Sequence, residues 1–363
     1  MRLLIFNLAT DLDNPTQGFN TRWIWALAKR VEFINVITMR AGRVDVPRNV
    51  RVYSVGKEKG FSEPRRAMEF YRHLFRILRE DRIDVCFSHM IPIFSILAAP
   101  VLKAKRIPIV TWYAHRHVTT TLKVAHYLSD QIVTSATASY RYKHDKLTVV
   151  GQGIDSDLFS PNGTLSDDPP LLLSVGRLSP IKDPMTLIEA VYLLRQRRYS
   201  VLCALVGDAP DRDRHYATAL RQRVQALDLE DSVQFIGAVP NEQVVKWYRR
   251  SFAHVNCSPS DHSLDKAVLE AMACEKPSLS STLGFKESMD KWADWLFFRH
   301  GDAKDLAGKI ERLLQLSDAE KRPIGNHLRH AVVTQHNLEG MTQRLLALFA
   351  TMGQGQQSYS GRM

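Results

Sequence analysis

The chain has 363 residues, of which 45% are hydrophobic and 24% charged. This is an ordinary globular composition, and the length predicts two domains. The cysteines are widely spaced, form no CxxC pair and have no histidine cluster beside them, which argues against a disulfide scaffold or a zinc module and favours a reducing cytosol. They are Cys86, Cys203, Cys257 and Cys274.

The formal net charge is +11. Residues 1–165 hold 24 basic and 14 acidic residues, whereas residues 166–363 hold 25 and 24. Nearly all of the excess positive charge therefore lies in the N-terminal half. This asymmetry predicts that the N-terminal half meets an anionic partner.

The first apolar run, which begins LLIF, is followed by an acidic residue at Asp11, too early for the apolar core of a secretory signal. It predicts a buried strand. The apolar stretch from Ile91 to Leu102 is about half the ~20 residues that a spanning helix needs, and prolines interrupt it. We therefore expect a cytoplasmic protein without a membrane-spanning segment.

Short apolar runs alternate with amphipathic stretches along the chain, a pattern typical of βαβ units. The turn-rich segment SPNGTLSDDPP interrupts the alternation at residues 160–170. We predict an α/β protein of two tandem doubly wound, Rossmann-like domains, 1–162 and 168–335, with ligands at the carboxyl ends of the strands. A helix near 337–352 is expected to pack back on the first domain, and residues 353–363 are expected to be disordered.

The segment SVGRLSPIKD at residues 174–183 carries the clearest chemistry. An apolar strand ends at Gly176, which permits a tight turn, and Pro184 is typical of the first turn of a helix. Arg177 and Lys182 lie between them. Two cations beside a helix N-terminus suit a diphosphate, although two solvated surface charges would produce the same pattern.

A second segment, residues 258–281, places a Ser-, Asp- and His-containing loop before a helix expected from about Lys266 to Ala273. Glu270 lies on that helix among apolar neighbours. A partly buried carboxylate needs hydrogen-bond donors. Ribose hydroxyls or a structural salt bridge could supply them.

Taken together and in order, these segments resemble the retaining glycosyltransferases of family four, which have the GT-B fold and use nucleotide-diphosphate sugars. The resemblance covers essentially the whole chain. It rests on DLDNPTQGFNTRW, WYAH at 112–115, VVGQGIDSDLFSP, SVGRLSPIKD, VQFIG at 233–237 and VLEAMACEKPSLSS.

The resemblance implies a role for each matching position. Arg177 and Lys182 would hold the donor diphosphate beside Gly176, and Glu270 would bind the ribose. The backbone around Phe235 to Gly237 would pass near the base. Gly18 would let backbone approach the phosphates or the acceptor, and His115 would contact the donor sugar; a structural histidine at a strand end is the alternative for His115.

One position departs from the family pattern. The family usually has a glutamate eight residues before the ribose glutamate, and this chain has His262 there. Asp265 could replace the lost carboxylate, as could Asp261, and Lys266 could add a phosphate contact. No cofactor is expected beyond the donor substrate. No metal is expected either, because the three Asp-x-Asp matches fall in loops where capping is the simpler role.

The segment PRRAMEFYRHLFRILRE at residues 64–80 predicts a basic amphipathic helix. Its expected apolar face comprises Met68, Tyr71, Leu74, Phe75 and Leu78. Such a helix could lie on an anionic membrane, or it could cover the first sheet with a solvated basic side. The apolar face can serve only one of these purposes.

These observations predict a retaining glycosyltransferase of hexosyltransferase type with an anionic acceptor, such as a lipid-linked or polysaccharide precursor. It would lie in the cytoplasm or at the inner face of the membrane. A GT-B sugar-nucleotide epimerase and a non-catalytic nucleotide-binding or scaffold protein are the alternatives. No nucleic-acid partner is expected, because the basic residues do not accompany a stacking or groove-reading module.

Overall fold

The computed structural model describes residues 1–115, 117–163, 168–259 and 264–360, and the side chains up to residue 352 within them. The chain divides into two compact units. Unit 1 comprises Met1–Gly153 and Leu338–Met363, and unit 2 comprises Ile154–Asn337. Each unit is built on its own parallel sheet.

Unit 1 contains a seven-stranded parallel sheet in the order β3-β2-β1-β4-β5-β6-β7. Its strands are β1 (Arg2–Asn7), β2 (Phe33–Thr38), β3 (Val50–Ser54), β4 (Val85–His89), β5 (Ile109–Trp112), β6 (Gln131–Thr134) and β7 (Leu147–Val149). The strand order reverses between β1 and β4, as in doubly wound folds.

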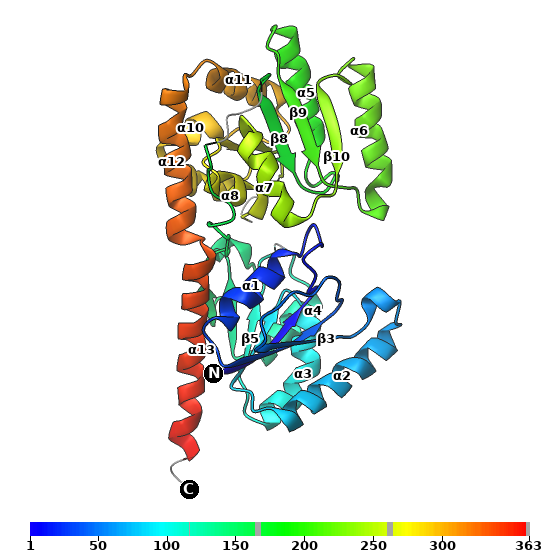
Figure 1. Ribbon diagram of the computed structural model, residues 1–363, viewed down its shortest axis with the longest axis vertical. Helices are drawn as coiled ribbons and strands as arrows, with labels where there is room; N and C mark the ends of the chain where they lie inside the picture. The colour runs from blue at the N-terminus through cyan, green and yellow to red at the C-terminus, as the bar shows by residue number, and fades with distance from the viewer. Residues whose placement is uncertain (116, 164–167, 260–263, 361–363) are drawn as a thin grey trace. The chain divides into compact units, whose positions relative to one another are not determined.

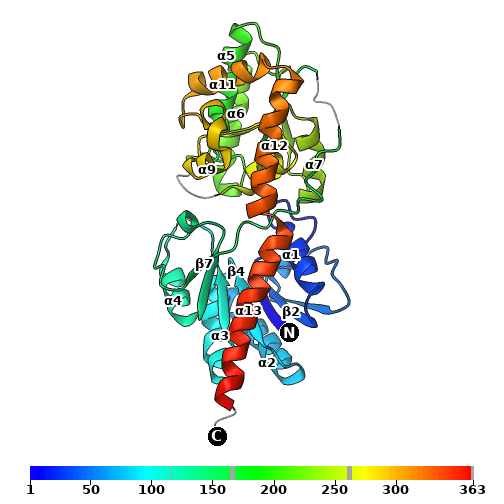
Figure 2. The same cartoon turned by 90° about the vertical axis from the view of Figure 1, so that its left-hand side faces the viewer.

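Helices cover both faces of this sheet (Figure 1). They are α1 (Phe19–Ala28), α2 (Glu63–Glu80), α3 (Pro92–Ala104), α4 (Thr120–Leu128) and α13 (Leu338–Ser360). Successive residues of β1 point to opposite faces, so Leu3 and Ile5 join the core under α1 and α13, and Leu4 and Phe6 join the core under α2 and α3. Figure 2 shows α13 lying across its face of the sheet.

Unit 2 contains a five-stranded parallel sheet in the order β10-β9-β8-β11-β12. Its strands are β8 (Leu171–Val175), β9 (Leu202–Val206), β10 (Val233–Gly237), β11 (Ala253–Asn256) and β12 (Ser278–Ser280). The strand order reverses between β8 and β11. A crevice at the carboxyl ends of these two strands is where doubly wound sheets bind ligands.

Two groups of helices pack around the sheet of unit 2 (Figure 1). One group comprises α5 (Pro184–Gln196), α6 (Arg214–Ala226) and α11 (Ala303–Leu314). The other comprises α7 (Asn241–Arg250), α8 (Lys266–Ala273), α9 (Lys286–Met289) and α12 (Asp318–Gln335), and the short α10 (Ala293–Leu296) contacts both α9 and α11. The α/β architecture predicted from the alternating pattern is confirmed.

Two sequence-based expectations differ from the structure. Helix α13 runs to Ser360, past the end expected at residue 352 and into the tail expected to be disordered. In α2, the buried side chains are Phe70, Leu74 and Ile77. The predicted apolar face was therefore wrong for Met68 and Phe75, which are exposed, because the helix turns a different side toward the sheet.

None of the helices that the structure describes is long and apolar enough to cross a bilayer.

Three glycines close the carboxyl edge of the unit 2 sheet. Gly176, Gly207 and Gly237 follow or end β8, β9 and β10, and all have positive φ. The amide of Gly207 donates to the carbonyl of Gly237, and the amide of Gly176 donates to that of Val206. A Cβ atom on Gly207 would lie 2.0 Å from the carbonyl oxygen of Gly176, so glycine is required there.

We predict that Gly207→Ala lowers the free energy of unfolding by about 2 kcal/mol, because the added methyl group meets backbone and the φ of 137° disfavours alanine. Urea denaturation measures the change. Gly308→Ala in α11 is the control, because its Cβ would enter open space. It should leave stability unchanged or raise it by about 0.5–1 kcal/mol. Equal stability of the two variants would contradict the assigned close approach.

Candidate donor-binding site

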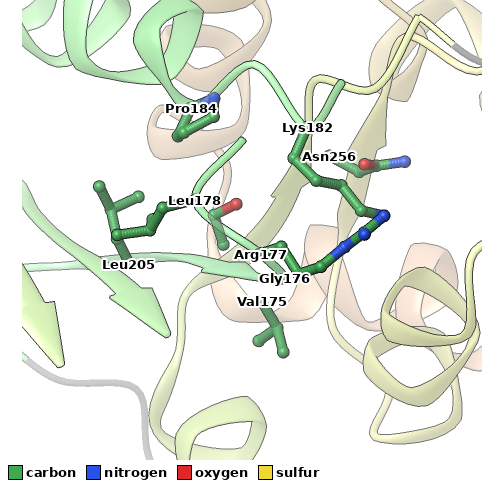
Figure 3. A pocket seen from close by; sticks show the side chains of 9 residues that line it. Val175, Gly176, Arg177, Leu178, Lys182, Pro184, Leu205 and Asn256 are labelled. Carbon is green, nitrogen blue, oxygen red and sulfur yellow. The ribbon is translucent and has the colours of Figure 1, made fainter. Parts of the chain in front are cut away.

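A pocket lies where the strand order of unit 2 reverses. It is lined by the end of β8, by the loop that follows, by the first residue of α5, by Leu205 of β9 and by Asn256 at the end of β11. The complete set is Ser174, Val175, Gly176, Arg177, Leu178, Lys182, Pro184, Leu205 and Asn256. Figure 3 shows Arg177 and Lys182 extending toward one another from opposite ends of the loop. The structure thus brings together Arg177 and Lys182, the two cations predicted to hold a diphosphate, beside Gly176.

Local backbone bonds hold the loop in shape. Leu178 donates its amide to the carbonyl of Asp208, and Lys182 donates its amide to the carbonyl of Ser179. Asp183 caps α5, and its side chain accepts from the amide and hydroxyl of Thr186. Asp183 itself has a left-handed conformation with φ of 45°. These bonds fix the direction in which the loop enters the helix, and so the position of Lys182 at its start.

The N-terminus of α5 adds to the positive charge of the pocket. Its first residue, Pro184, lines the pocket, and the first turn of a helix presents a partial positive charge of its aligned peptide dipoles. Arg177 can fork to two oxygens, and Lys182 supplies a compact charge. The pocket therefore matches an anion with several oxygens, such as a diphosphate.

Lys182 is ion-paired with Asp265, which lies 83 residues further along the chain. Asp265 also caps α8 by accepting from the amide of Ala267 at 3.3 Å. Burial opposes ionisation of Asp265, but the neighbouring Lys182 ammonium outweighs it and lowers the pKa of the carboxyl. The carboxylate thus stays charged and holds Lys182 in place.

Glu270 is buried in α8 and bonded to side chains of α7. Its two carboxylate oxygens accept from the amide nitrogen of Asn241 and from the hydroxyl of Tyr248, both at 3.1 Å. Burial raises its pKa, and burial also lowers the pKa of Lys266 one turn earlier in the same helix. The side-chain amide of Asn241 and the phenol of Tyr248 thus supply the hydrogen-bond donors that the buried Glu270 carboxylate needs.

Gly237 ends β10 beside Asp208, whose Oδ1 would lie 3.6 Å from an added Cβ. Just before it, Phe235 has the guanidinium of Arg221 4.3 Å from its ring centroid.

Gly18 and His115 belong to unit 1. Gly18 precedes α1, and a Cβ atom there would lie 2.9 Å from the carbonyl oxygens of Leu12 and Asn14. The loop before the helix thus folds tightly against Gly18. His115 is exposed after β5, and its Nδ1 accepts from the amide of His117 at 3.3 Å. His262, the position that departs from the family pattern, and Asp261, a possible replacement for the lost carboxylate, lie outside the described residues.

Sequence reasoning missed several polar residues of this region. Asn256 completes the pocket, and Asn241 and Tyr248 satisfy Glu270. His254 in β11 is 1% exposed, and neither of its ring nitrogens has a hydrogen-bond partner among the described residues. Asn256 could have been found as the polar residue that ends an apolar strand. The other three lie within apolar or helical patterns that carry no such signal.

The model of the family described as Glycosyl transferases group 1 matches residues 155–329. Residues 155–329 are a glycosyl transferases group 1 domain. They lie within unit 2 and contain the whole of the pocket described above. The family resemblance predicted from the sequence is confirmed for this part of the chain.

Curated relatives of this chain include D-inositol 3-phosphate glycosyltransferases. That of Frankia alni is 30% identical over 184 residues, which cover 47% of this chain and 45% of the relative. That of Kribbella flavida is 28% identical over 152 residues, which cover 38% and 35%. The matched regions thus make up less than half the length of each of these relatives.

Solved structures resemble the chain over nearly its full length. Anabaena Alr3699/HepE in complex with UDP has a TM-score of 0.76 at 16% identity, and covers 97% of this chain and 100% of its own. Sucrose-phosphate synthase from Thermosynechococcus elongatus has a TM-score of 0.79 at 17% identity, with 96% and 99% covered. These similarities confirm the predicted GT-B fold.

The buried His254 generates a pH prediction for the stability of this domain. Burial, the largest effect, lowers its pKa to about 4 from the usual 6.5. The folded protein therefore binds this proton less readily than the unfolded chain. The free energy of unfolding is therefore highest above pH 6.5, where His254 is neutral in both states. It falls by about 3 kcal/mol in total as the pH drops toward 4, because the unfolded chain then binds the proton.

We expect His254→Leu to remove that part of the pH dependence, because leucine adds no titrating group and leaves no buried polar atom unbonded. Urea unfolding between pH 4 and 7 measures it. His215→Gln, at an exposed histidine of α6, should retain the wild-type slope. An unchanged slope in His254→Leu would show that His254 does not titrate in this range.

Proposed function

We propose that the chain is a glycosyltransferase that binds a nucleoside-diphosphate sugar in unit 2 and transfers the sugar to an anionic acceptor. The observation that carries the proposal is the convergence of Arg177, Lys182 and the N-terminus of α5 at the crevice between β8 and β11. Anabaena Alr3699/HepE, which shares the fold, binds UDP and glucose. This supports a nucleotide sugar as the donor.

Charge development explains the role of the two cations. Cleavage of the bond between the anomeric carbon and the diphosphate leaves negative charge on the departing nucleotide and positive character on the sugar. Cations that are already in place stabilise that negative charge without reorganising during the reaction. Asp265 contributes by holding Lys182 at the pocket, so the ammonium would lie between this carboxylate and a bound phosphate.

Glu270 is proposed to bind the donor ribose, with the backbone at Gly237 near the base. A carboxylate oxygen has two lone-pair directions, so each Glu270 oxygen can keep its bond from Asn241 or Tyr248 and accept another. Lys266 is proposed to add a phosphate contact. His115 is proposed to contact the donor sugar. Gly18 is proposed to let backbone approach the donor phosphates or the acceptor.

The acceptor is proposed to bind mainly to unit 1, because the excess positive charge lies in the N-terminal half of the chain. An anionic acceptor such as a lipid-linked diphosphate sugar satisfies that charge. We further propose that the reaction occurs at the cytoplasmic membrane surface, that the sugar keeps its anomeric configuration and that no metal is required.

Substitution of the pocket cations tests the donor site. Arg177→Ala and Lys182→Ala should each weaken binding of a nucleoside diphosphate about 10- to 100-fold, because each removes a charge-assisted contact to phosphate. Isothermal titration with UDP, GDP and ADP as probes gives the affinities. The nucleotide that binds most tightly to the wild type identifies the base preference.

Matched controls separate a local loss of contact from a general change in charge. Arg322→Ala in α12 and Lys304→Ala in α11 remove exposed cations of the same domain and should bind as the wild type does. If all four variants bound the preferred nucleotide with wild-type affinity, the assigned phosphate site would be wrong.

The reaction itself separates transfer from epimerisation. A transferase releases free nucleoside diphosphate only when an acceptor is present, and proton NMR of the product shows whether the anomeric configuration is retained. We expect release that depends on acceptor, with retention. Isomerised donor formed without acceptor would establish the epimerase alternative, and binding without either reaction would establish a non-catalytic protein.

A further inference from the structure

Helix α2 presents a mixed basic and apolar row of side chains to solvent. Along its length, the exposed residues recur at intervals of three and four, so they lie on one side of the helix. We call this row the α2 stripe; it comprises Arg65, Met68, Arg72, Phe75 and Arg79. Two large apolar side chains therefore alternate with three arginines.

The stripe is not needed by the core of unit 1. The opposite side of α2 buries Phe70, Leu74 and Ile77 against the sheet. Met68 and Phe75 remain 62% and 55% exposed. Figures 1 and 2 show α2 on the outside of the unit 1 sheet. The sequence alone left open whether the apolar residues of α2 serve the core or another surface, and the structure divides them between the two.

Positive charge continues beyond the helix. The guanidinium of Arg65 lies 3.6 Å from the ring centroid of Phe61, in the loop before α2. The preceding short helix Lys57–Lys59 exposes both lysines and Glu58 between them, and so adds one net positive charge. The acidic residues of α2 lie at its ends or beside the stripe: Glu69 is paired with Arg72, and Glu80 is paired with Arg76 and, at 3.9 Å, with Arg79. Carboxylates therefore lie beside the stripe and partly offset the charge of Arg72 and Arg79.

We propose that the α2 stripe docks on an anionic lipid bilayer. Phe75 and Met68 would enter the boundary between headgroups and acyl chains, and the arginines would bind lipid phosphates. A protein partner fits less well, because a stable protein interface buries about 800 Å² on each side and two isolated apolar side chains on a convex helix offer far less. A bilayer accepts such side chains singly.

This proposal rests on the proposed function for its purpose, since a lipid-linked acceptor would be met at the same surface. Its physical basis is separate, because the stripe lies in unit 1 and the donor pocket in unit 2. Vesicle binding and nucleotide binding can therefore be measured independently on the same variants.

The test uses the full chain and sedimentation with vesicles of phosphatidylglycerol mixed with phosphatidylcholine. Wild-type protein should bind these vesicles and bind pure phosphatidylcholine vesicles much less. Met68→Ser with Phe75→Ser should weaken binding at least tenfold at equal salt, because the inserted apolar surface is lost. Both positions are exposed, so the fold and the affinity for UDP should be unchanged.

A matched double variant removes exposed apolar side chains from unit 2. Leu283→Ser with Val333→Ser should bind vesicles as the wild type does. A second variant, Arg65→Gln with Arg72→Gln and Arg79→Gln, should reduce both the affinity and its dependence on salt.

Wild-type binding to the anionic vesicles that the Met68 and Phe75 substitutions leave unchanged would overturn the proposal. So would an absence of wild-type binding. A concentration-dependent dimer that the same substitutions abolish would assign the stripe to a protein contact instead and would also overturn it. If vesicle binding were lost while UDP binding persisted, the stripe would be confirmed independently of the donor site.

Discussion

The site in unit 2 depends on one topological constraint, the reversal of strand order between β8 and β11. These two strands are neighbours, but the connections from their carboxyl ends lead to opposite sides of the sheet. The two connections therefore leave a crevice between the carboxyl ends of these strands, which no single loop covers. Arg177 and Lys182 follow β8, and Asn256 ends β11, so side chains distant in sequence converge at that gap.

The glycines at the sheet edge and the ion pair with α8 keep this gap in shape. Gly207 allows the chain after β9 to touch the backbone after β8, which fixes the loop carrying Arg177. Asp265 binds Lys182 and caps α8 at the same time, so the position of the lysine is linked to the helix that carries Glu270. The two segments that the sequence singled out are thereby in direct contact.

Local patterns predicted what depends on neighbours in the chain. The strand ending at Gly176, the helix beginning at Pro184 and the two intervening cations were all predicted from the sequence, because turn, cap and charge signals lie within ten residues. The pairing of Lys182 with Asp265 was not, because it joins residues brought together only by the sheet. The same reason explains why Asn241 and Tyr248 were not recognised as partners of Glu270. In α2, helical periodicity predicted an amphipathic helix but could not decide which side the sheet would bury.

The central claim is that the crevice between β8 and β11 holds the diphosphate of a sugar nucleotide. A crystal structure of the chain with its preferred nucleoside diphosphate tests this most directly. The account predicts phosphate oxygens within hydrogen-bonding distance of the Arg177 guanidinium and the Lys182 ammonium, with the phosphates facing the first turn of α5. A diphosphate bound elsewhere, with the Lys182–Asp265 pair and Arg177 untouched, would contradict it.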